Sequence, residues 1–200
     1  MTTTDPVAVA IEVARTFERL GIRYVLGGSL ASTAFGEPRS TLDVDFAADL
    51  TPNTLEPWAA AMEPSFFLDR AWARQEVAAR GSFQLLHRTA LLRVEVFVPP
   101  WSDLHLWKWE HRVRLALDPA SNTTIDVTSP AGIVLQKLAW YRAGGDVSDR
   151  QWRDVVGVLK TQLGQLDRTE MQQWATRVGI ADLLQRAESA AGWPPRNDTA

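Results

Sequence analysis

The chain has 200 residues, of which 46% are hydrophobic and 22% charged, and its formal net charge is −3. This composition supports an ordinary hydrophobic core and excludes a disordered chain, a collagen-like chain and a disulfide-stapled miniprotein. The sequence has no Cys and only three His, which excludes thiolate catalysis, iron–sulfur clusters and Cys-ligated zinc and leaves no His pair at metal-ligand spacing. The acidic balance excludes a whole-molecule attraction to nucleic acid, so such binding needs a local basic patch.

The N-terminal sequence has no basic region followed by an apolar stretch, as a secretory signal would, and no run of about 18 apolar residues can span a membrane. We therefore expect a soluble, cytoplasmic protein with no membrane partner.

The first part of the chain alternates helical and strand patterns. A helix is predicted between an N-cap at Asp5 and a stop at Gly21, because apolar residues recur there at helical spacing. A strand (22–26), a short helix (29–35) and a strand with period-two alternation (42–47) follow, and then helices near 53–62 and 72–80.

Two strand pairs follow, and after them the chain is helical. The first pair (82–87 and 90–98) is joined by a turn at Arg88 and Thr89, and the second pair (111–117 and 123–127) by a turn at 118–122. Ser129 and Pro130 begin a helix that runs to about residue 143, and two or three helices fill 148–190. We therefore expect an α+β domain with a mixed sheet (1–128), a C-terminal helical region (129–191) and a loose tail (192–200).

The first group of candidate site residues joins a glycine turn to an acidic strand. Gly27, Gly28 and Ser29 follow a strand. After 13 intervening residues come Asp43 and Asp45, which lie on the same face of the next strand. Paired carboxylates repel each other unless a cation or proton lies between them, and a divalent cation bridging to phosphate is the usual solution. The glycines allow close approach of a ligand, and the start of the next helix offers N–H groups to phosphate. An ordinary strand–turn–helix is the structural alternative.

Glu95 is the candidate third carboxylate. It is the only acidic residue in an apolar strand, where an isolated charge is costly unless it is paired or bound to metal. Arg93, two residues away on the same face, offers a simple ion pair as the alternative.

A second group of candidates lies in the helical region. Lys137, one of three lysines, falls within the apolar stripe of its predicted helix, where it needs an anionic partner such as a phosphate. Asp149 or Asp154 on the next helix is a candidate to hold Lys137 or to act as a base. In the alternative interpretation Lys137 extends to solvent and Asp149 caps its helix.

Two further features have a functional and a structural interpretation. Trp101, Trp107 and Trp109 share one predicted loop with His105 and Lys108, where they can stack on bases or simply be buried. Arg39, just before the acidic strand, can reach phosphates or pair with Glu37.

These motifs together resemble the polymerase-β-like nucleotidyltransferase superfamily. The resemblance rests on Gly27-Gly28-Ser29, on the segment from Arg39 to Asp45 and on Glu95. The helix with Lys137, followed by the segment from Asp149 to Asp154, is similar to AbiEii-type nucleotidyltransferase-like proteins, which include toxins of phage-defence and toxin–antitoxin systems. The resemblance covers roughly residues 20–165.

The resemblance implies a nucleotidyltransferase-like mixed sheet with flanking helices, and Mg²⁺- or Mn²⁺-dependent transfer of a nucleoside monophosphate from an NTP to a hydroxyl, with release of pyrophosphate. It implies that Asp43, Asp45 and Glu95 hold metal, and that Gly27, Gly28, Ser29 and Arg39 bind substrate phosphates. It further implies that Lys137 neutralises the triphosphate and that Asp154 orients Lys137 or the acceptor.

The acceptor is left open by the sequence. The resemblance favours RNA, first the 3′ end of tRNA, with a toxin or phage-defence role and a possible antitoxin partner. A protein hydroxyl that receives AMP and a cationic small molecule of aminoglycoside type are the alternatives, and the acidic charge suits the latter. A partner-binding module of the same fold without catalysis is the alternative from a different class.

Overall fold

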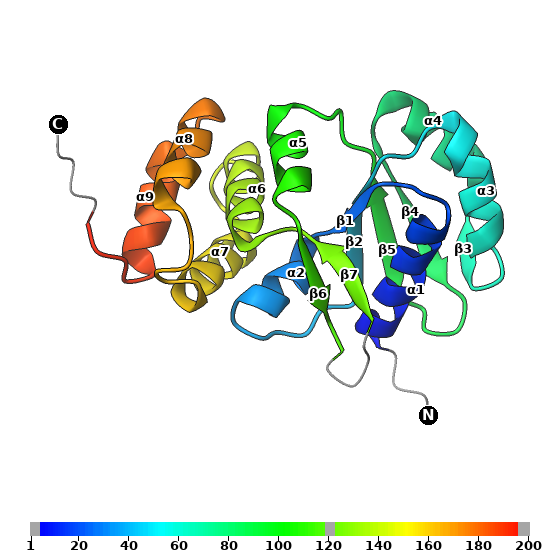
Figure 1. Cartoon of the computed structure of the whole chain (residues 1–200), viewed down its shortest axis with the longest axis horizontal. Helices are drawn as coiled ribbons and strands as arrows, with labels where there is room; N and C mark the ends of the chain where they lie inside the picture. Colours follow the sequence, from blue (N-terminus) through cyan, green and yellow to red (C-terminus); the bar gives the residue numbers. More distant parts are fainter. Residues whose placement is uncertain (1–4, 119–122, 196–200) are drawn as a thin grey trace. The chain divides into compact units, whose positions relative to one another are not determined.

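A computed structural model describes residues 5–118 and 123–195, so the predicted turn residues 119–122 and the tail end 196–200 lie outside it (Figure 1). The chain divides into two compact units. The first comprises Met1–Ala31 and Ser40–Thr128, and the second comprises Ser32–Arg39 and Ser129–Ala200. The division passes within helix α2 (Gly28–Phe35) and directly before helix α6 (Pro130–Ala143).

The first unit is built on a mixed sheet, which within the described residues has seven strands in the order β3-β4-β5-β2-β1-β7-β6. The pairs β1–β7 and β2–β5 are parallel and the other neighbours are antiparallel. The strands are β1 (Tyr24–Leu26), β2 (Asp43–Ala48), β3 (Phe66–Leu68), β4 (Ser82–His87), β5 (Arg93–Phe97), β6 (Val113–Ala116) and β7 (Thr124–Val127). The predicted α+β class with a mixed sheet is confirmed.

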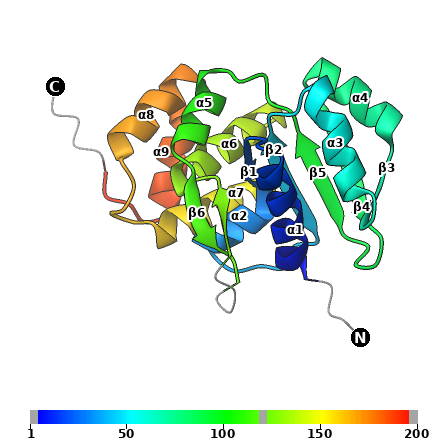
Figure 2. The ribbon, with the colours of Figure 1, turned by 45° about the vertical axis from the view of Figure 1, so that its right-hand side comes forward.

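One face of this sheet is buried under helices α1 (Pro6–Arg19) and α3 (Pro52–Met62) (Figure 2). Phe17 of α1 stacks on Tyr24 and on Trp58 of α3, with ring centroids 5.4 and 5.2 Å apart, and meets Phe46 of β2 edge-on. Val44, Phe46 and Ala48 of β2 are buried, whereas the residues between them are half-buried. The alternation therefore places the acidic residues of β2 on the opposite face of the sheet, which we call the open face.

Local signals explain where the helices of this unit begin and end. The Asp5 carboxylate accepts the Val7 N–H at 2.9 Å and Gly21 ends the α1 segment at φ +65°, as the sequence predicts. Thr51 and Thr54 form a reciprocal capping box at the start of α3. Helix α4 (Arg70–Ala79) is capped by Asp69 and packs on α3 and β4.

Two elements of this unit escape sequence-based prediction. Strand β3 is three residues long and pairs only with β4, so it carries no period-two signal. Helix α5 (Asp103–Glu110) replaces the predicted loop around the tryptophans. Its apolar residues Leu104 and Leu106 alternate with polar ones, a pattern that is not helical. The β4–β5 connection is also longer than the predicted turn, because Leu91 adopts φ +53° and β5 begins only at Arg93.

The second unit is helical. It contains α6, α7 (Asp149–Thr161), α8 (Arg168–Arg177) and α9 (Ala181–Ala190), with α6 packed on α7 and α9 packed on α7 and α8. The end of α2 is fastened to α7, since the Thr161 hydroxyl and the Gln162 amide both donate to the Phe35 carbonyl. Trp193, at the start of the expected loose tail, is buried and donates its indole N–H to the Leu159 carbonyl at 2.8 Å.

No helix within the described residues is long and apolar enough to span a membrane.

Candidate functional site

The glycine turn and the acidic strand are direct neighbours in the folded first unit. Leu26 pairs with Phe46, so the Gly27 N–H donates to the Asp45 carbonyl at 2.8 Å. Gly28 begins α2 with φ +58°, and a Cβ atom there would lie 1.7 Å from Asp45 Oδ2. The Asp45 carboxylate therefore lies directly against the Gly28 backbone, a position that only glycine permits.

Ser29 and Thr128 border the same turn. Ser29, the second residue of α2, is buried. Thr128, which follows β7, is also buried; its N–H donates to the Leu26 carbonyl at 2.8 Å, and its hydroxyl lies 3.9 Å from an ideal Cβ at Gly27. The sequence did not indicate Thr128, because its proximity depends on the parallel pairing of β7 with β1.

The three predicted carboxylates share the open face of the sheet. Asp43 and Asp45 alternate with the buried Val44, as predicted, and Asp45 is the register partner of Glu95 on the parallel strand β5. Directly paired residues on neighbouring strands point to the same face. The sheet thus brings Glu95, 50 residues later in the sequence, beside the acidic pair.

Asp43 and Glu95 each accept hydrogen bonds from side chains of neighbouring strands. Arg93 donates to Asp43 Oδ1 from Nε at 3.1 Å and from Nη2 at 2.8 Å. The Ser82 hydroxyl donates to Glu95 Oε1 at 3.0 Å. The alternative pairing of Arg93 with Glu95 is therefore wrong, because strand register places Arg93 opposite Asp43. Ser82 had no sequence signal, since it reaches Glu95 only through the antiparallel pairing of β4 with β5.

The donor set suits a hard divalent cation in type, since it offers carboxylate oxygens from adjacent strands on one face. Within the described residues, however, no three acidic or histidine side chains are grouped so that they can hold a metal ion. In this arrangement Asp43 accepts hydrogen bonds from Arg93, and Glu95 accepts one from Ser82.

The second unit holds the other predicted residues, which form a charged cluster of their own. Lys137 Nζ lies 2.8 Å from Asp154 Oδ2 and 3.1 Å from the Gln151 side-chain oxygen. Arg39 donates to both oxygens of Asp154, at 2.8 and 3.0 Å. Lys137 is buried rather than extended to solvent, and Arg39 pairs with Asp154 rather than with Glu37.

Two cations on one buried carboxylate control its protonation. Burial alone raises the pKa of Asp154, but the hydrogen bonds and charges of Arg39 and Lys137 outweigh burial, so that the pKa lies below its ordinary value. Asp149 is not part of this cluster, and the cap of α7 is Ser148, whose hydroxyl accepts the Gln151 N–H at 3.4 Å. Of the two predicted partners of Lys137, the structure selects Asp154.

The tryptophan-rich segment has a structural role. Trp107 and Lys108 are buried, and Trp101 donates its indole N–H to Asp49 at 2.8 Å. Arg23 lies over the Trp101 ring, 4.8 Å from its centroid. The segment thus joins α5 to the ends of β1 and β2.

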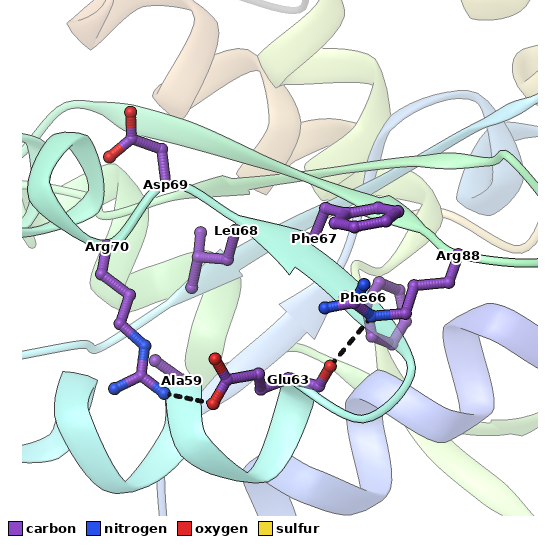
Figure 3. A pocket seen from close by; sticks show the side chains of 8 residues that line it. All are labelled: Ala59, Glu63, Phe66, Phe67, Leu68, Asp69, Arg70 and Arg88. Carbon is purple, nitrogen blue, oxygen red and sulfur yellow. Dashed lines mark hydrogen bonds and ion pairs between the residues drawn. The ribbon is translucent and has the colours of Figure 1, made fainter.

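A pocket of about 390 Å³ opens beside the edge strand β3 (Figure 3). In Figure 3 Arg70 contacts the Glu63 carboxylate, at 2.8 Å, and Arg88 the Glu63 carbonyl, at 3.1 Å. Strands β4 and β5 separate β3 from β2. The pocket is lined by Ala59, Glu63, Phe66, Phe67, Leu68, Asp69, Arg70 and Arg88, none of which is a predicted site residue.

No protein-family model and no curated protein matches the chain. Among the solved structures that resemble it over most of its length, two have a TM-score above 0.5. An antigenic nucleotidyltransferase-like protein from Paracoccidioides brasiliensis is 17% identical, with 92% of each chain covered and a TM-score of 0.53. The antibiotic-resistance factor ANT(2'')-Ia is 12% identical, with 92% of this chain and 97% of that chain covered and a TM-score of 0.51. At such identities the likeness is one of fold, and the chain has a nucleotidyltransferase-like fold.

Proposed function

We propose that this protein transfers a nucleoside monophosphate from an NTP to an acceptor hydroxyl. The observation that carries the proposal is the contact of the Gly28 turn with Asp45, which joins a candidate phosphate-binding helix start to a pair of carboxylates. In the proposed reaction the acceptor oxygen bonds to the α-phosphorus, the bond from this phosphorus to the bridging oxygen breaks, and pyrophosphate leaves with that oxygen. The hydroxyl proton passes to a nearby base or to water.

The residues of the open face and of the start of α2 would have different roles in this reaction. Asp43 and Asp45 would hold Mg²⁺ or Mn²⁺, which when bound neutralises charge on the triphosphate. Gly28 and Ser29 would bind phosphate oxygens with their backbone N–H groups and the Ser29 hydroxyl. Glu95, oriented by Ser82, would complete the metal site or accept the proton of the acceptor hydroxyl.

The acceptor that we propose is an RNA 3′ end. Phe67, Leu86, Arg93 and Asp43 are successive register partners across β3, β4, β5 and β2, so they form one row on the open face. Phe67 is 53% exposed and Leu86 40% exposed. Arg88 lies over the Phe67 ring at 3.8 Å. An exposed aromatic ring beside an arginine is a surface on which bases can stack. The row places Phe67 on the same face of the sheet as Asp43.

The test is a labelling reaction with the purified chain, Mg²⁺ and each α-³²P-labelled NTP, supplied with total tRNA and, separately, with a cell lysate. We expect label in RNA from the wild type and none from the Asp43→Asn/Asp45→Asn double variant. Phe67→Ala should raise the RNA concentration needed for half-maximal rate. Leu163→Ala, which removes a similarly exposed apolar side chain of the second unit, should not.

Other outcomes would redirect the proposal. Label in protein would indicate an AMP-adding enzyme, and label in a small cationic acceptor would indicate an aminoglycoside-type enzyme. No transfer and no nucleotide binding would favour a partner-binding module. A toxin or phage-defence role with an antitoxin partner, and a cytoplasmic location, stay predictions that rest on the resemblance to AbiEii-type proteins.

That Lys137 contributes charge to phosphate binding also stays a prediction. A Lys137→Ala protein that folds normally and binds nucleotide more weakly would support it. Loss of the fold with unchanged nucleotide affinity would make Lys137 a structural residue.

A further inference from the structure

The Arg93 guanidinium forms an ion pair with Asp43, one of the carboxylates that the proposed reaction requires. Its Nε and Nη2 both donate to Asp43 Oδ1, at 3.1 and 2.8 Å. The contact follows from the backbone, because Arg93 and Asp43 are register partners on the parallel strands β5 and β2 and share the open face. A metal ion that binds Asp43 therefore meets a cation that is already there.

The ion pair between Arg93 and Asp43 is partly exposed, so it can break and Arg93 can form another. The Arg93 side chain is 49% exposed and that of Asp43 31% exposed, and ion pairs with this much solvent access contribute little to stability. Arginine pairs with carboxylate and phosphate groups alike, so a guanidinium that leaves Asp43 favours another anion. An incoming nucleotide triphosphate supplies one on the same face of the sheet.

We infer that Arg93 is an internal counter-ion that holds Asp43 in the empty enzyme and turns to the nucleotide phosphates when substrate binds. The inference rests on the proposed function. In the empty enzyme Arg93 weakens metal binding, because its contact with Asp43 must first break. With nucleotide present Arg93 has a new partner, so nucleotide and metal strengthen each other's binding. Arg93 is thus a positioning residue that couples the two binding events.

The test measures Mn²⁺ binding by the electron paramagnetic resonance of free Mn²⁺, with and without α,β-methylene-ATP, which resists transfer. In the wild type we expect weak Mn²⁺ binding that tightens with nucleotide beyond the Mn²⁺ affinity of the nucleotide itself. Arg93→Ala should tighten Mn²⁺ binding without nucleotide by about two- to fivefold and reduce the effect of nucleotide. Arg93→Lys keeps the positive charge but lacks the paired N–H donors of the guanidinium, so its Mn²⁺ affinity should lie between those of the wild type and Arg93→Ala.

Two matched variants make the result decisive. Arg186→Ala removes an exposed arginine of α9 that lies over the Trp152 ring, 5.1 Å from its centroid, and that has no role in the proposed reaction, and it should keep the wild-type Mn²⁺ affinity. Asp43→Asn should lose Mn²⁺ binding. Equal Mn²⁺ affinity in the wild type and Arg93→Ala, with loss in Asp43→Asn, would overturn the role of Arg93 and leave the proposed function standing.

A wild type and an Arg93→Ala protein that both fail to bind Mn²⁺ would overturn the proposed function and the inference with it. Mn²⁺ binding by Arg93→Ala alone would support the inference in its strongest form. Circular dichroism of each variant establishes that it is folded, and Arg93→Gln, which keeps the length of the side chain, replaces Arg93→Ala if the latter does not fold.

Discussion

Single residues of the candidate site meet two requirements at once. Gly28 must adopt φ +58° and must also leave room for the Asp45 carboxylate. The first requirement is visible in the sequence as a Gly-Gly pair after a strand, whereas the second depends on the pairing of β1 with β2. Sequence patterns therefore predicted a role for Gly28 and Asp45, and the structure adds the contact between them.

Gly28→Ala should move the Asp45 carboxylate, and Gly21→Ala provides the matched control. Both glycines have positive φ, +58° and +65°, so each alanine pays a similar backbone cost of about 1–2 kcal/mol. Nothing lies within 4 Å of a Cβ at Gly21. We expect Gly28→Ala, but not Gly21→Ala, to weaken Mn²⁺ and nucleotide binding, and the clash with Asp45 should add to its loss of thermal stability. Equal binding in the two variants would show that Asp45 has room to adjust.

The buried Asp154 should matter more to stability than either of its cationic partners. Asp154→Ala leaves Lys137 and Arg39 without their shared carboxylate and should cost about 3–5 kcal/mol, as measured by urea unfolding. Lys137→Ala should cost less, because Arg39 still pairs with Asp154. A larger loss in Lys137→Ala would contradict this order.

The low pKa of Asp154 also predicts a pH dependence. A carboxyl whose pKa is lower in the folded than in the unfolded protein adds stability above its unfolded pKa of about 3.9. That stability is lost as the pH falls through the lowered pKa. The stability difference between the wild type and Asp154→Asn should therefore be full at pH 6 and shrink below about pH 4. A difference that stays constant down to pH 2 would show that Asp154 acts through packing alone.

At the scale of elements, the sequence was informative wherever a local signal existed. The caps of α1 and α6, the alternation in β2 and the period of α6 are all local, and these elements appear where predicted. Strand β3 and helix α5 depend on tertiary contacts, because β3 is stabilised by pairing with β4 and α5 by burial of Trp107. The cluster around Asp154 was half predicted: helical spacing identified Lys137, whereas Arg39 joins only because α2 ends against α7.

The packing of the α2 end on α7 gives opposite predictions for two glycines. A Cβ at Gly36 would lie 2.9 Å from the Ser32 carbonyl oxygen and 3.0 Å from the Val158 nitrogen, and neither backbone atom yields easily. Gly36→Ala should cost about 1–3 kcal/mol. Gly157, inside α7, meets only ordinary contacts with Glu37, beginning at 3.4 Å, so Gly157→Ala should add up to about 1 kcal/mol through helix propensity. Thermal unfolding of both variants checks the signs, and two losses of similar size would refute the distinction.

For the whole molecule, sequence and fold agree on a nucleotidyltransferase-like architecture. The motifs predicted the fold class because a glycine turn and an acidic strand are each formed by a few consecutive residues and can be recognised in the sequence. The partner of each carboxylate was not predictable, since Arg93 and Ser82 reach Asp43 and Glu95 through strand register. No sequence motif indicates the acceptor. The proposal of an RNA acceptor rests on the row of residues from Phe67 to Asp43, which depends on strand register.

Nucleotide should stabilise the whole molecule together with metal. At a hundredfold excess over the dissociation constant, a ligand that binds only the folded protein adds about 2.7 kcal/mol, which for a chain of this size raises the Tm by roughly 5–10 °C. We expect this rise with Mg²⁺ and ATP together and a smaller one with either alone. Differential scanning fluorimetry measures it, and the Asp43→Asn/Asp45→Asn protein should show none. An unchanged Tm in the wild type would remove support for the enzyme.

The ends of the sheet have a consequence for how this protein behaves at high concentration. Within the described residues, the sheet ends in β3 on one side and β6 on the other, strands of three and four residues. An arginine lies at each end of the sheet. Arg88 lies over one face of the Phe67 ring of β3, and Arg114 of β6 is half exposed and pairs with Glu18. Short edge strands that carry charged side chains are poor templates for a strand of another molecule. The open face can thus keep an exposed aromatic side chain, Phe67, without making the sheet prone to aggregation through its edges.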